Sequence, residues 1–159
     1  MCGSRNVAGY GGHYRKEVIM KVILGIDYGD ARTGLAICDK LGMLAVGAGC
    51  IKCEGIKKTV EAAALAAKEK KCELIVVGNP INMDGSEGPR SAKCKKFAAM
   101  LEEASGIPVK LYDERLTTVS AHRFLSYTNV RGQKRKDSVD ELSATLILQD
   151  FIDRNRDSL

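Results

Sequence analysis

An apolar run leads straight into a carboxylate in Val22-Ile23-Leu24-Gly25-Ile26-Asp27, and a second run, Thr33-Gly34-Leu35-Ala36-Ile37, follows after a short loop. Short apolar runs bounded by turn residues are typical of buried strands. An ionisable side chain at the end of a buried strand is uncommon unless a partner charge or a ligand compensates it. Asp27 is therefore the first candidate for a functional site.

The pattern that continues from Asp27 predicts alternating strands and helices. Strands at 21–27, 33–38 and 43–51 are separated by hairpin-length loops, which indicates an antiparallel meander. The order continues with a helix at 54–71, a strand at 73–77, a helix from Pro89 to about Ser105 and a strand at 108–112. It ends with a helix from Thr117 or Thr118 to about Ser126 and a last helix from Ser138. Because strands joined through helices are expected to be parallel, the prediction is an α/β fold with a five-stranded mixed sheet and flanking helices.

Size and composition indicate one domain. The chain has 159 residues, 45% of them apolar and 28% charged, with a net charge of +5 that leans mildly towards acidic partners such as nucleic acid. Residues 1–19 lack an apolar period and are predicted to be a flexible tail, with Met20 a plausible start codon, so 20–159 form the single domain. No apolar run is long enough for a membrane span, and six cysteines without a secretory signal predict reduced thiols and a cytoplasmic protein.

Two more carboxylates are candidates to join Asp27, namely Glu114 and Asp140. If the fourth and fifth strands lie beside the first, then Asp27, Asn79 and Glu114 meet at the edge where open α/β sheets bind ligands. Asp140 lies on the same helical stripe as Ala144, Ile147 and Phe151, which should face the sheet. Carboxylates from separate elements suit Mg²⁺ or Mn²⁺, two of which promote phosphodiester cleavage. The combination predicts a metal-dependent nuclease.

Each acid also has a structural interpretation. Asp27 could form a turn ahead of Gly29, Glu114 could belong to a solvated turn, and Asp140 could favour the helix dipole. Glu141 is assigned to helix initiation, because Ser138-x-x-Glu141 matches a capping box. Cys50 and Cys53 have a metal-site spacing but no second pair of ligands at a matching distance, so ordinary thiols are favoured.

Basic and polar residues near these acids are candidates for substrate contact. Arg131, Lys134, Arg135 and Lys136 precede Asp140 and form either a phosphate-binding loop or a solvated surface loop. Arg32 and Arg115 neighbour the acids and could bind phosphate or pair with a carboxylate. Asn79 completes the substrate-binding set. Aromatic residues make up 5% of the chain, which argues against recognition by base stacking.

Four ordered motifs resemble the YqgF (RuvX) family. They are Gly25-Ile26-Asp27-Tyr28-Gly29 with Arg32, Gly34 and Ala36; Val76-Val77-Gly78-Asn79-Pro80 with Met83-Asp84-Gly85-Ser86; Asp113-Glu114-Arg115-Leu116-Thr117-Thr118 with Ala121; and Val139-Asp140 with Ala144 and Ile147-Leu148-Gln149. The resemblance covers Lys21 to about Asp153. Asn79 and Ser143 depart from the family's usual leucine and alanine.

The resemblance implies a ribonuclease H-like fold and a nuclease whose acids are Asp27, Glu114 and Asp140, with Mg²⁺ or Mn²⁺ as cofactor. It implies maturation of the 5′ end of pre-16S ribosomal RNA, or resolution of Holliday junctions. The expected partner is structured RNA or branched DNA rather than a membrane, and the expected state is a monomer or weak dimer.

Two further classes of function compete with the nuclease. A non-catalytic ribosome-assembly or RNA-binding factor could keep the fold, but clustered negative charge near phosphate brings no gain to binding alone. A sugar-kinase or actin-like phosphate loop could explain the stretch from Asp27 to Gly34, but those folds need two such domains and this chain is too short.

Overall fold

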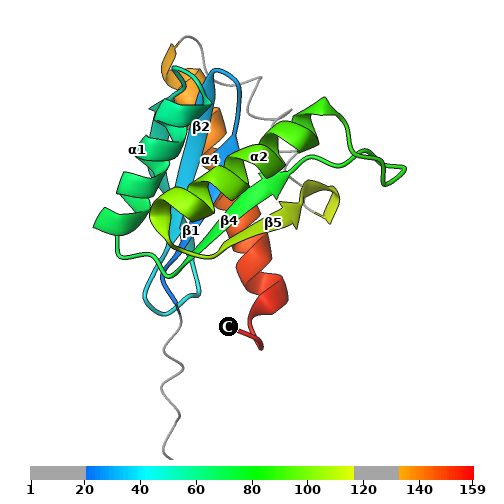
Figure 1. Cartoon of the computed structure of the whole chain (residues 1–159). Helices are drawn as coiled ribbons and strands as arrows, with labels where there is room; N and C mark the ends of the chain where they lie inside the picture. The colour runs from blue at the N-terminus through cyan, green and yellow to red at the C-terminus, as the bar shows by residue number, and fades with distance from the viewer. Residues whose placement is uncertain (1–20, 117–132) are drawn as a thin grey trace, which may run out of the picture.

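A computed structural model describes residues 21–116 and 133–159, and the predicted tail and the predicted helix after Thr117 lie outside these residues. The elements are β1 (Ile23–Tyr28), β2 (Arg32–Cys38), β3 (Ala45–Lys52), α1 (Ile56–Glu69), β4 (Leu74–Asn79), α2 (Pro89–Ser105), β5 (Val109–Asp113), a 3-10 helix (Glu114–Leu116) and α4 (Gln133–Asn155) (Figure 1). None of the helices in these ranges is both long enough and apolar enough to cross a membrane.

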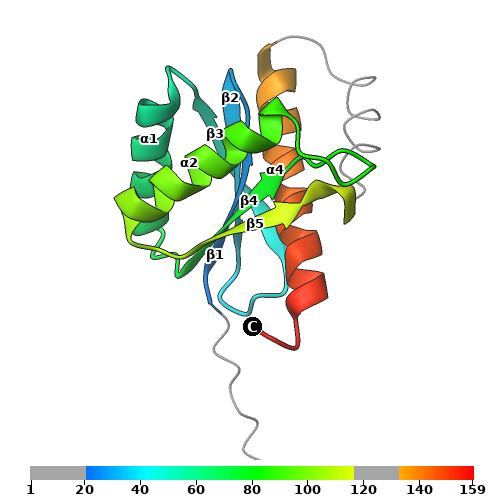
Figure 2. The same cartoon turned by 45° about the vertical axis from the view of Figure 1, so that its right-hand side comes forward.

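The sheet has the predicted mixed topology. Its strand order is β3-β2-β1-β4-β5, with β1 antiparallel to β2, β2 antiparallel to β3, and β1, β4 and β5 parallel. Helices α1 and α2 cover one face and α4 crosses the other, so that the sheet is the middle of three layers (Figure 2). The meander and the parallel arrangement of the later strands are therefore confirmed.

Alternate residues of the central strands enter two separate cores. On β1, Leu24 and Ile26 belong to the core under α1 and α2, whereas Ile23 belongs to the core under α4. Every residue of β1 and β4 is buried, because both faces of these strands are covered. This explains why they appear in the sequence as continuous apolar runs instead of alternating ones.

The last helix differs from its prediction at the start. It begins at Gln133, so Ser138 lies inside the helix and the predicted capping box of Ser138 and Glu141 is wrong. Glu141 instead contacts the sheet: a Cβ added at Gly47 of β3 would lie 1.9 Å from its Oε1 atom. The predicted stripe of Ala144, Ile147 and Phe151 is buried, as expected. A capping pattern at Ser138 was misleading because the helix continues for more than a turn before it.

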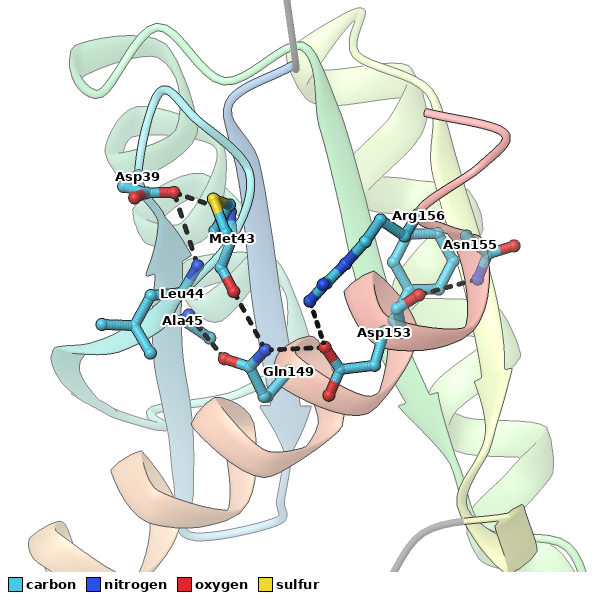
Figure 3. Close-up of polar contacts among 9 residues, drawn as sticks. Asp39, Met43, Leu44, Ala45, Gln149, Asp153, Asn155 and Arg156 are labelled. Carbon is cyan, nitrogen blue, oxygen red and sulfur yellow. Dashed lines mark hydrogen bonds and ion pairs between the residues drawn. The ribbon is translucent and has the colours of Figure 1, made fainter. Parts of the chain in front are cut away.

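A glutamine of α4 holds the β2–β3 hairpin at the open edge of the sheet (Figure 3). The Gln149 side chain accepts a hydrogen bond from the Ala45 N–H at 2.8 Å and donates one to the Met43 carbonyl at 3.2 Å. Within the hairpin, Asp39 accepts from the Met43 N–H at 2.9 Å. The amide thus satisfies backbone groups that an edge strand otherwise leaves to solvent or to another chain.

We expect Gln149→Met to lower the free energy of unfolding by about 1–2 kcal/mol, because it removes the two hydrogen bonds to the hairpin backbone and an exposed one to Asp153 while keeping the side-chain length. Urea denaturation measures the change. Arg156→Gln is the control, since it removes only an exposed ion pair with Asp153 and should shift stability by less than about 0.5 kcal/mol. Equal effects of the two substitutions would contradict the role of Gln149.

Candidate active site

The carboxyl ends of the three parallel strands meet at one edge of the sheet. Asp27 is the penultimate residue of β1, Asn79 is the last residue of β4, and Glu114 directly follows β5. The paired registers Ile26↔Val77 and Gly78↔Tyr112 align these ends. The structure therefore brings the predicted residues of separate strands to the same edge.

The backbone of Asp140 comes close to the sheet at a glycine beside Asp27. Asp27 is only 5% exposed and pairs in register with Gly34 of β2, so the two residues face the same side of the sheet. A Cβ added at Gly34 would lie 1.9 Å from the backbone carbonyl oxygen of Asp140. Helix α4 therefore contacts the sheet at the strand position beside Asp27, and it can do so only because residue 34 has no side chain.

Glu114 reaches the same face over a second glycine. A Cβ added at Gly78 would lie 2.5 Å from Glu114 Oε1 and 2.7 Å from Ile147 Cδ1 of α4. Gly78 follows Val77, the register partner of Ile26, so it stands beside Asp27 on the neighbouring strand. The carboxylate of Glu114 thus lies over the sheet between β5 and Asp27. Its position comes from the 3-10 helix, which the sequence did not predict.

The donor atoms at this edge suit a hard divalent cation, since all three side chains offer carboxylate oxygens. Within residues 21–116 and 133–159, no group of three or more histidine, cysteine, aspartate or glutamate side chains is already gathered as a metal site. The three acids share an edge and a face, and a bound cation would offset the repulsion that opposes bringing three negative charges closer. The three residues therefore match a divalent cation in the type of ligand that they offer.

Arg115 pairs with a carboxylate, one of the two alternatives that its sequence position left open. Its Nε lies 3.1 and 3.0 Å from the two carboxylate oxygens of Asp113, and its Nη2 lies 2.7 Å from Oδ2. The hydrogen bonds from Arg115 lower the pKa of Asp113 below its usual value. Asp113 is thus engaged with Arg115, and Glu114 is the acid of this pair that faces the candidate site.

The other predicted contact residues fall into three groups. Arg32 begins β2 two residues before Gly34, and so shares the face of Asp27. Asn79 is buried and its Oδ1 accepts a hydrogen bond from Ser91 of α2 at 2.7 Å, which gives it a structural tie. Lys134, Arg135 and Lys136 belong to the start of α4, so the predicted loop is helical there, and Arg131 lies outside the described residues.

Two glycines are the site residues whose role sequence reasoning missed. Gly34 lies inside β2 and Gly78 inside β4, and a glycine inside a strand often marks a close approach of another segment. That signal was present in the sequence. It does not reveal which segment approaches, because the partner of Gly34 is more than 100 residues away along the chain.

The fold is that of the RuvC resolvases. The chain resembles RuvC of Thermus thermophilus in complex with a Holliday junction substrate, with a TM-score of 0.52 and 18% identity over 85% of this chain and 96% of that one. The Holliday junction resolvase of fowlpox virus gives a TM-score of 0.50 and 12% identity over 84% and 99%. This places the molecule in the ribonuclease H-like class of folds.

The chain belongs to the RuvX family, whose model, described as Holliday junction resolvase, matches residues 21–154. A protein of Ruminiclostridium cellulolyticum named "Putative pre-16S rRNA nuclease" is 43% identical over 83% of this chain and 94% of its own length. A protein of the same name from Myxococcus xanthus is 39% identical over 84% and 88%. The family resemblance seen in the four motifs is thus confirmed.

We expect Gly34→Ala to destabilise the fold by about 3 kcal/mol or more, because the new methyl group would meet the backbone of α4 rather than a movable side chain. Gly88→Ala is the matched control. A Cβ there would have its nearest neighbour at 3.8 Å, so the cost should stay below about 1 kcal/mol. Urea denaturation of both variants compares them, and similar midpoints would contradict the close approach of α4.

Tyr112 of β5 ties that strand to α4, and this contact should depend on pH. The Tyr112 hydroxyl donates a hydrogen bond to Asp150 Oδ2. Burial is the main cause that raises the pKa of Tyr112, and this hydrogen bond is the second cause. The protonated phenol then stabilises the fold below the unfolded pKa of about 10, and the stabilisation is lost as pH rises towards the folded pKa. Tyr112→Phe should cost about 1–2 kcal/mol at pH 8. The difference from wild type should shrink by pH 11, and a constant difference in urea midpoints would contradict the assignment.

Proposed function

We propose that this chain is a divalent-metal-dependent nuclease that hydrolyses phosphodiester bonds in nucleic acid. The observation that carries the proposal is the placement of Asp27, Glu114 and Asp140 from three separate elements at one edge and on one face of the sheet. The names of relatives about 40% identical support the same activity. A binding protein has no use for three acids where phosphate would lie.

The three acids differ in how rigidly the fold holds them. Asp27 is buried in a central strand, so its carboxylate has the most fixed position. Asp140 is fixed by the contact of α4 with Gly34, whereas Glu114 sits on a short 3-10 helix over Gly78. Mg²⁺ or Mn²⁺ bound between them would activate water and stabilise charge on the attacking and leaving oxygens. The carboxylates would hold the metal ion, and the basic residues around them would bind the phosphates of the substrate backbone.

We propose precursor 16S ribosomal RNA as the substrate, with cleavage at its 5′ end, because the relatives carry that name. The net charge of +5 and the aromatic content of 5% fit recognition through phosphates rather than stacked bases. Resolution of Holliday junctions is the second candidate, favoured by the family description and by the RuvC-like fold. It would require a dimer that presents two sites to a symmetric junction.

The test is cleavage of a pre-16S ribosomal RNA fragment and of a four-way DNA junction, each with Mg²⁺ or Mn²⁺. Asp27→Asn, Glu114→Gln and Asp140→Asn should each lower the rate by roughly 100-fold or more, since a lost metal ligand removes several kcal/mol of transition-state stabilisation. Asp153→Asn is the matched control, because Asp153 is an exposed acid near the other end of α4 and should leave the rate unchanged.

The outcomes separate the candidates. RNA cleavage that requires metal and all three acids supports the processing nuclease, whereas cleavage of the junction alone would move the function to recombination. Cleavage that survives all three substitutions would mean that the active site is elsewhere. Tight RNA binding without cleavage of either substrate would favour an assembly factor.

A further inference from the structure

Helix α2 begins at the same edge of the sheet as the acids, on the opposite face. The buried hydrogen bond from Ser91 Oγ to Asn79 Oδ1 at the end of β4 fixes its first turn there. On the surface, Lys93 Nζ lies 2.7 Å from Asp30 Oδ1 in the β1–β2 turn. Asp30 lies in the loop that directly follows the strand carrying Asp27. Figure 2 shows the first turns of α2 and of α4 at the same end of the molecule.

The start of α2 carries positive charges that strong ion pairs with the described residues do not neutralise. Arg90 is exposed and makes no ion pair with any residue in the described parts of the chain. Lys93 pairs with Asp30, but the two side chains are 56% and 72% exposed, so water and salt compete with that pair and it adds little to stability. Arg115 differs from both, because two nitrogen atoms of its guanidinium, Nε and Nη2, donate hydrogen bonds to Asp113.

These cations lie within electrostatic reach of the acids. Burial raises the pKa of the Cys94 thiol on α2 to about 11; among the nearby charges, Glu114 and Asp27 act in the same direction and Arg90 acts against them. The start of α2 and the acids thus lie at the same end of the sheet, on its two faces. For a strand of nucleic acid cleaved at this edge, the start of α2 is the neighbouring basic surface on the face opposite α4.

We propose that Arg90 and Lys93 bind phosphates of the RNA strand that the acids cleave, on the side of the sheet opposite α4. The proposal rests on the proposed function and adds a contact surface that the sequence did not indicate. An arginine free of other ion pairs can bind phosphate through two N–H groups. A phosphate can replace Asp30 as the partner of Lys93. While Asp30 is the partner, its negative charge offsets part of the attraction between Lys93 and the nucleic-acid backbone.

The experiment measures binding of a pre-16S ribosomal RNA fragment to the full chain by fluorescence anisotropy, without divalent metal, over a series of salt concentrations. Arg90→Gln and Lys93→Gln should each weaken binding about fivefold at 0.1 M salt, and each should reduce the slope of log K against log salt by about 0.7. Lys70→Gln is the control, because Lys70 is exposed at the far end of α1 and should change neither quantity.

Asp30→Asn should change the affinity for RNA in the opposite direction. It removes a negative charge and releases Lys93, so RNA should bind more tightly than to the wild type, whereas a lysine held only for structure would give no gain. The proposal would be overturned if Arg90→Gln and Lys93→Gln kept the wild-type salt slope, or if Asp30→Asn left the affinity unchanged.

Cleavage assays keep this proposal distinct from the nuclease itself. Arg90→Gln should raise KM and leave kcat within about twofold, because a phosphate contact of this type binds substrate and transition state alike. Asp27→Asn should abolish cleavage and preserve the salt slope. If the wild type cleaved nothing while Arg90 and Lys93 still controlled the slope, the surface would stand and the nuclease proposal would fall.

Discussion

The contact between α4 and the bare backbone of the sheet determines most of this structure. At Gly25, Gly34 and Gly78 an added Cβ would lie within 2.7 Å of Leu148, Asp140, Glu114 or Ile147. Helix and sheet can therefore approach more closely than ordinary side chains permit. This approach closes the second core and brings the Asp140 backbone to the strand position beside Asp27, while Gly78 leaves room for the Glu114 side chain on the neighbouring strand. Stability and the candidate site thus depend on the same glycines.

The remaining contacts of α4 keep the helix in register along its length. Gln149 binds the edge strand β3, and Asp150 accepts hydrogen bonds from Tyr112 of β5 and from Arg154 of its own helix. The helix is thereby tied to both outer strands of the sheet. Asp140, near the start of this helix, is therefore held in place partly by the contacts that Gln149 and Asp150 make with the outer strands.

Sequence reasoning succeeded where the residue pattern is local. The buried runs around Asp27 and Val76 gave the strands, the helix-linked connections gave their parallel order, and the stripe from Ala144 to Phe151 gave the inner face of α4. It failed where a tertiary contact decides. Ser138 has a capping pattern but lies inside a helix, and the 3-10 helix that carries Glu114 over Gly78 was not predicted. Arg90 was not singled out from the sequence, because only the fold, through the contact of Ser91 with Asn79, brings the start of α2 to the edge of the sheet that carries the acids.

The central claim, that Asp27, Glu114 and Asp140 together hold a divalent cation, is tested most directly by Mn²⁺ binding followed by electron paramagnetic resonance in the absence of nucleic acid. The account predicts that the wild type binds Mn²⁺, that Asp27→Asn, Glu114→Gln and Asp140→Asn each weaken this binding, and that Asp153→Asn does not. Wild-type Mn²⁺ affinity in all three site variants would contradict it.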